Sequence, residues 1–168
     1  MSMEFVDPKR CVIGTIGLPG ERTFYWQITH DGASLSLKME KQQAAIIADE
    51  LDDLLDELDI AGDDGRVTGG LKDTEPLIMP IDEEYAVGGM GIFVEDGRIR
   101  IELSMLSSDA DSDKQADLVI IYLAVNRVRE FAARARVVVS AGRGNCPFCS
   151  LPIERTGHIC ARSNGYRR

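Results

Sequence analysis

Apolar and polar positions alternate with two different periods along this chain, and the change from one period to the other occurs twice. Residues 11–17 are rich in β-branched side chains, and residues 23–30 and 33–39 alternate between apolar and polar, which predicts three strands. Turn chemistry separates them, first at Leu18-Pro19-Gly20-Glu21 and then at Asp31-Gly32. We therefore expect an antiparallel meander.

A helix is predicted over residues 41–59, because apolar side chains recur there at helical spacing while the acidic side chains lie away from that stripe. The stripe consists of Ile47, Leu51, Leu54, Leu55 and Leu58. Residues 61–82 are rich in glycine, aspartate and proline, which indicates a long connection.

The pattern then restarts. Residues 85–94, 98–106 and 118–123 have the character of strands, and a second helical stripe begins at Val125 and continues through Val128, Phe131, Ala132 and Ala135. The motif Gly14-Thr-Ile-Gly17 has a counterpart in Gly88-Gly-Met-Gly91. Either an internal duplication or similar local folding explains the likeness of the two halves.

We therefore predict an α+β fold. Its body, residues 1–140, has an antiparallel sheet built from two βββα halves, at about residues 1–60 and 83–139, and residues 141–168 form a small zinc knuckle.

Composition places the chain among globular proteins. Apolar residues make up 44% and charged residues 28% of its 168 residues, and the mean hydropathy is -0.11. No apolar run approaches the roughly 20 residues of a membrane-spanning helix, and residues 1–10 lack the order of a signal peptide. A soluble, cytoplasmic protein without membrane contact is expected.

The net charge of -9 is divided unevenly. Residues 127–168 contain nine arginines and two glutamates, which gives +7, so the first 126 residues sum to -16. This basic end either engages an acidic partner or nucleic acid, or docks on the acidic body of its own chain or of another subunit.

Four residues near the C-terminus have the spacing of a zinc site. Cys146 and Cys149 form a Cys-x-x-Cys turn, and His158 and Cys160 follow after eight residues. Three thiolates and one imidazole fill the tetrahedral shell of Zn²⁺ and leave no position for substrate, so a structural role is predicted. The remaining cysteine, Cys11, lies in an apolar run and is expected to be a buried hydrophobic residue.

Gly17, Gly20 and Arg22 are the candidate ligand-binding residues of the body. Gly14, Gly17 and Gly20 have a spacing that suggests a phosphate loop. Such a loop requires a helix directly after it, whereas residues 23–30 have the pattern of a strand. Hairpin geometry is the favoured explanation, and anion binding by Arg22 is the alternative. His30 is expected to be a surface residue.

Several motifs together resemble a known family. They are Gly14-Thr-Ile-Gly17, Pro19-Gly20-Glu-Arg22-Thr23-Phe24-Tyr25, Glu40-Lys41-Gln42-Gln43, Met79-Pro80, Ser140-Ala-Gly-Arg143, His158-Ile-Cys160 and Asn164-Gly165-Tyr166-Arg167-Arg168. The chain resembles, over nearly its whole length, an uncharacterised actinobacterial family, domain of unknown function 3090, and the resemblance implies no settled activity. Where relatives begin the second helix with Thr-Pro-Glu, this chain has Ala124-Val125-Asn126, with Asn126 as the expected cap.

Two functions from different classes fit these features. The first is a non-enzymatic binding or regulatory module, braced by structural zinc, that engages a protein partner, a second copy of the chain or an acidic ligand. The alternative is an enzyme or regulator acting on a phosphorylated small molecule or nucleotide, with Arg22 and the glycine turns of both halves lining one cleft. Nucleic acid is the third choice, because the acidic body repels a phosphate backbone.

Overall fold

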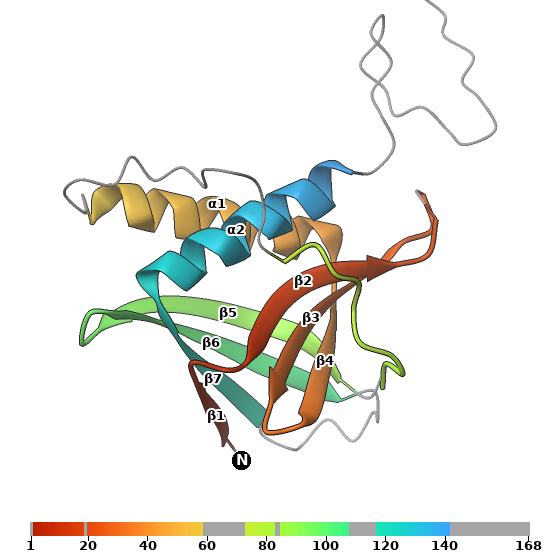
Figure 1. Cartoon of the computed structure of the whole chain (residues 1–168), viewed down its shortest axis with the longest axis horizontal. Coiled ribbons are helices and arrows are strands. Elements are labelled where there is room, and N and C mark those ends of the chain that lie inside the picture. Colours follow the sequence, from red (N-terminus) through yellow and green to blue (C-terminus); the bar gives the residue numbers. More distant parts are fainter. Residues whose placement is uncertain (1, 19, 59–72, 83–84, 108–116, 142–168) are drawn as a thin grey trace, which may run out of the picture.

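The computed structural model describes residues 2–18, 20–58, 73–82, 85–107 and 117–141. They form one seven-stranded sheet with two helices on one face (Figure 1). In chain order the elements are β1 (Ser2–Val6), β2 (Arg10–Ile16), β3 (Thr23–His30), β4 (Ala33–Met39), α1 (Lys41–Glu57), β5 (Tyr85–Glu95), β6 (Arg98–Ser107), β7 (Asp117–Ala124) and α2 (Val125–Ser140). The predicted α+β class and both βββα successions are confirmed.

The sheet is mixed, and this corrects the expected antiparallel arrangement. Its strand order is β1-β7-β6-β5-β4-β3-β2, with parallel pairs at β1/β7 and β4/β5. The sequence did not predict β1, a five-residue strand whose partner begins at Asp117, because so short a segment has no readable period of its own. The two halves meet side by side at β4 and β5, where the register contains the single pair Lys38 and Ala86.

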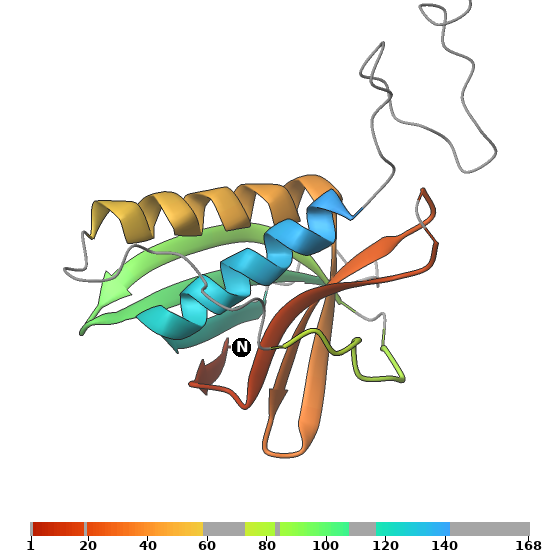
Figure 2. The ribbon, with the colours of Figure 1, turned by 45° about the horizontal axis from the view of Figure 1, so that its top comes forward.

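The narrow β4/β5 junction divides the sheet into two sets of strands that run at a steep angle to each other (Figure 2). Helix α1 follows β4 through a capping box, in which the side chain of Gln43 accepts a hydrogen bond from the N–H of Glu40. The same amide donates to the carbonyls of Val87 and Gly88, each at 3.1 Å, next to an irregularity in the β5/β6 register. Gln43 therefore ties the start of α1 to the other half of the sheet.

Helix α2 begins at Val125 with Ala124 as its N-cap residue, and no side chain caps it. The expected cap, Asn126, is therefore wrong by two residues, since Asn126 already lies inside the helix. Helix α2 packs beside α1 and across β2, so the helix of the second half covers a strand of the first.

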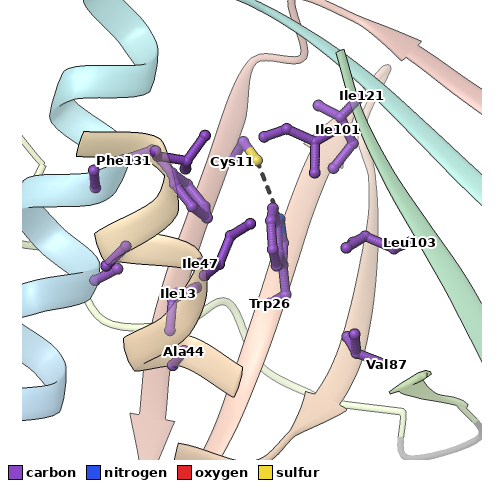
Figure 3. Close-up of a cluster of buried hydrophobic side chains, with 14 of the residues drawn as sticks. Cys11, Ile13, Trp26, Ala44, Ile47, Val87, Ile101, Leu103, Ile121 and Phe131 are labelled. Atoms are coloured by element: carbon purple, nitrogen blue, oxygen red, sulfur yellow. Dashed lines mark hydrogen bonds between the residues drawn. The ribbon is translucent and has the colours of Figure 1, made fainter. Parts of the chain in front are cut away.

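One hydrophobic core lies between the helices and the sheet, and both halves contribute to it. Its centre is Trp26, which is fully buried and whose ring centroid is 4.7 Å from that of Phe131 on α2 (Figure 3). The indole N–H donates to the Sγ atom of Cys11 at 3.3 Å. Because burial of apolar area is the main source of stability, the two halves stabilise each other and are not separate domains.

Residues 73–81, here called the strap, cover the opposite face of the first half. Leu77 of the strap is buried against Val12 and Tyr25. A Cβ atom added at Gly14 would lie 2.5 Å from Leu77 Cδ2, so the glycine makes room for this leucine. Residues 73–81 of the predicted connection are therefore a partly buried part of the fold.

The strap is also held by its backbone. Gln27, fully buried on β3, accepts a hydrogen bond from the N–H of Ile78 at 2.8 Å and donates to its carbonyl at 3.0 Å. The side-chain amide thus pairs with the N–H and the carbonyl of one strap residue as a neighbouring strand would, which satisfies polar groups that would be costly to bury unpaired.

In the second half, the space beside the corresponding glycine is filled by side chains of the sheet itself. A Cβ atom at Gly88, the sequence counterpart of Gly14, would lie 2.6 Å from Ser104 Oγ and 3.1 Å from Leu106 Cγ. Both side chains come from the neighbouring strand β6. The same glycine thus admits a leucine in each half, from the strap in one and from the sheet itself in the other.

We predict that a chain ending at Ser140 folds cooperatively, because the buried residues of the main core, among the residues that the structure describes, lie between Cys11 and Ala135. Urea denaturation followed by circular dichroism should show a single sigmoidal transition. An unfolded product would mean that the C-terminal residues belong to the core, which would contradict the division at residue 140.

Candidate functional site

The four predicted zinc ligands, Cys146, Cys149, His158 and Cys160, lie outside the described residues. Within the described ranges, no three histidine, cysteine or acidic side chains come together as a metal site. The chemistry that the body itself offers is found in three places: the β2–β3 turn, the edge of β2, and the buried thiol of Cys11.

The β2–β3 turn contains the predicted ligand-binding residues, and its shape requires glycine. Gly17 and Gly20 have φ angles of 105° and 92°, in the left-handed region that side chains rarely adopt. A Cβ atom at Gly17 would also lie 2.8 Å from the carbonyl oxygen of Glu21. The N–H of Glu21 donates to the carbonyl of Leu18 at 2.9 Å, which closes the turn.

Arg22 is directed at the end of helix α2. Its Nη1 atom donates to the carbonyl of Val138 at 3.1 Å, and its guanidinium lies over the ring of Phe24, 5.2 Å from the centroid. Helix α2 has no basic residue in its last turn, so Arg22 brings a positive charge from another element to the negative end of the helix dipole. The described contacts of Arg22 thus position a helix terminus.

The two glycine motifs do not meet. Gly88 and Gly91 lie within β5, whereas Gly14 lies in β2, and strands β3 and β4 separate them in the sheet. The shared cleft that the phosphate-handling alternative requires is therefore not formed by these residues.

Arg134 forms the centre of the second place, at the open edge of the sheet. This α2 residue is only 8% exposed, and its Nε atom donates to the carbonyl of Ile13 on edge strand β2 at 3.0 Å. Its Nη1 atom donates to the carbonyl and the carboxylate of Asp73 at 3.0 and 3.1 Å, and its Nη2 atom to the carbonyl of Glu75 at 2.7 Å. One side chain therefore joins the helix, the edge strand and the strap.

Arg10 completes this cluster from the start of β2. Its Nε and Nη2 atoms donate to the two carboxylate oxygens of Asp73 at 2.7 and 3.0 Å, in a bidentate pair. It also donates to the carbonyls of Glu75 and Pro76. We call Arg10, Asp73 and Arg134 the edge cluster.

The pKa values of Asp73 and Arg134 are shifted within the edge cluster. The hydrogen bond from Arg10 holds the pKa of Asp73 below its ordinary value. Burial lowers the pKa of Arg134, and the Asp73 charge partly offsets that effect. The sequence pattern does not predict this cluster, although it contains one signal: Arg134 interrupts the apolar stripe of α2 three residues after Phe131, where a solvated charge is not expected.

The thiol of Cys11 is buried in the core, and the ring of His30 lies at the surface. Burial raises the pKa of Cys11 to about 12, so the reactive thiolate is suppressed, and the prediction of a buried hydrophobic residue is confirmed. His30 lies at the surface as predicted, with its ring edge-on to Phe5 at 6.0 Å and its Nε2 atom 3.4 Å from the carboxylate of Asp31.

The two packed helices carry opposite net charges. Helix α1 has one lysine and six acidic residues, a net charge of -5, whereas α2 has four arginines and one glutamate, a net charge of +3. They pack side by side, and Arg136 forms an ion pair with Asp52. The first part of the basic end thus docks on the acidic body of its own chain.

These features define an α+β protein with a mixed, strap-covered sheet and no helix, among those described, that is long and apolar enough to cross a membrane. Residues 3–160 match the family model named "Protein of unknown function (DUF3090)", and the chain belongs to this family. No curated protein matches the chain.

We predict that Arg134→Met destabilises the protein by about 2–4 kcal/mol, because it leaves the Ile13 and Glu75 carbonyls without their charged donor inside the fold. The matched control is Arg136→Met on the same helix, whose ion pair is at the surface and should contribute less than about 1 kcal/mol. Urea denaturation measures both variants. Equal losses would mean that the edge cluster has no special role.

A second expectation concerns pH. The pKa of Asp73 is lower in the folded protein than in the unfolded chain, where it is about 3.9. The ionised Asp73 carboxylate therefore stabilises the fold fully above about pH 3.9, and this stabilisation is lost as the pH falls through the folded-state pKa. Wild type should therefore be more stable than Asp73→Asn at pH 7, with a difference that shrinks below about pH 4. Asp53→Asn, on the exposed side of α1, is the control and should follow the wild-type profile. A pH-independent difference would exclude this mechanism.

Proposed function

We propose that this protein is a non-enzymatic binding or regulatory module in which Cys146, Cys149, His158 and Cys160 hold a structural zinc ion beside the α+β body. The observation that carries the zinc site is the ligand spacing in the sequence. Three thiolates and an imidazole complete a tetrahedral shell, which is the arrangement of structural rather than catalytic zinc.

The body supports a binding role because its reactive groups are engaged in holding the fold together. Arg134 and Asp73 join the strap to β2, Arg22 holds the end of α2, and the thiol of Cys11 is buried. A catalytic site needs such groups directed into a cleft where substrate can reach them. Within the described ranges they are directed at the protein's own backbone instead.

The sheet face opposite the helices is where we place contact with a protein partner or a second copy of the chain. Val6 of β1, Phe93 of β5 and Leu106 of β6 lie on this face and are 48%, 44% and 52% exposed. The guanidinium of Arg100 lies over the Phe93 ring at 4.6 Å, and Glu95 and Glu102 flank it. Phe93 is opposite Arg100 in the β5/β6 register, Val6 lies in the same row beyond Tyr122, and Leu106 lies further along β6. An arginine beside an exposed aromatic side chain is typical of the residues that anchor protein interfaces.

The proposed zinc-binding cysteines also indicate the cellular compartment of the protein. Zinc-binding cysteines must stay reduced, and reducing conditions are those of the cytoplasm. We therefore place the protein there.

Zinc content tests the proposal. Purified full-length protein should contain about one zinc per chain by elemental analysis, and Cys149→Ser should lose most of it because it removes one thiolate of the shell. Cys11→Ala, outside the predicted ligand set, is the matched control and should retain the metal. Unchanged zinc in Cys149→Ser would contradict the ligand assignment.

A further inference from the structure

The end of helix α2 is held in a defined position, and the predicted zinc ligands follow directly from it. Arg22 binds the carbonyl of Val138, and the N–H of Ala141 donates to the carbonyl of Val137 at 2.9 Å. Only residues 142–145 separate Ala141 from Cys146. Since an extended chain advances about 3.4 Å per residue, Cys146 must lie within about 17 Å of Ala141.

Residues 146–160, here called the cysteine module, are too few to fold on apolar burial alone, and chains below about 40 residues usually need a metal, disulfides or oligomerisation. They nevertheless contain Phe148, Leu151, Ile153 and Ile159. A bound zinc ion would fix the backbone around these side chains, but it would not remove their apolar surface from water. An apolar neighbour within reach of the tether would remove part of that surface from water.

The structure offers such a neighbour where the chain leaves α2. Because Arg22 bonds to Val138, the β2–β3 turn lies beside the last turn of the helix (Figure 2). Leu18 in the turn and Val137 in the helix are 48% and 51% exposed. The turn that presents Leu18 is shaped by two left-handed glycines, Gly17 and Gly20, so this surface is built into the backbone.

We propose that the cysteine module docks on the surface formed by the β2–β3 turn and the last turn of α2, with Leu18 as its principal apolar contact. The inference rests on the proposed zinc site and extends it, since it names the surface that the zinc-bound module occupies. It also gives Gly17, Gly20 and Arg22 a role: they form and orient a platform for the C-terminal residues of the same chain.

The experiment compares full-length wild type with Leu18→Ser, each zinc-loaded and each treated with a chelator. Zinc should raise the Tm of wild type, because a module that docks only on the folded body stabilises it. Leu18→Ser should keep its zinc and lose most of that rise. Ile46→Ser, a 46% exposed position on α1, is the matched control and should keep both.

Hydrogen exchange on wild type gives an independent measurement. Zinc should slow amide exchange in residues 15–24 and leave the β5–β6 turn at Asp96-Gly97 unchanged. If wild type binds zinc but neither this protection nor an effect of Leu18→Ser is seen, docking at this surface is wrong and the zinc site stands. If wild type binds no zinc, the proposed zinc site is wrong, and the docking inference fails with it.

Discussion

The guanidinium of Arg134 is the interaction on which the arrangement of the chain depends. An edge strand presents unpaired carbonyls, and β2 is such an edge. Arg134 reaches from α2 to the carbonyl of Ile13 and also to Asp73 and Glu75 of the strap. One buried cation thereby fixes the helix of the second half over the edge of the first and anchors the segment that links them.

This interaction explains why two halves with the same order of elements form one body. Apart from the short strand β1, which pairs with β7 over five residues, their strands meet at the single register pair Lys38 and Ala86, which is little pairing to hold them together. Contacts of the helices provide the remaining stabilisation between the two halves. Trp26 of the first half packs on Phe131 of the second, and an acidic α1 lies against a basic α2. The charge asymmetry of the sequence is thus partly a packing device within the chain, which weakens nucleic acid as its explanation.

Much of the fold was readable from the sequence. Six of the seven strands and both helices lie within a few residues of their predicted positions, since strand and helix periods are local properties of the backbone. The turns were readable for the same reason, and Asp31 and Asp96 have the positive φ angles, 49° and 50°, that their Asp-Gly pairs suggest. The zinc ligand set also rests on local spacing, and it stays a prediction because its four residues lie outside the described ranges.

What the sequence by itself determined is therefore the local period of each segment, its turn chemistry and the family to which the chain belongs. Only the tertiary structure decided that β1 pairs with β7, that β4 and β5 lie parallel, and that Arg134 and Asp73 meet. The physical reason is that pairing between distant segments depends on the burial and hydrogen bonding of the whole assembly. The period of a segment does not specify which distant segment will bury its apolar side chains and form hydrogen bonds with its backbone N–H and C=O groups.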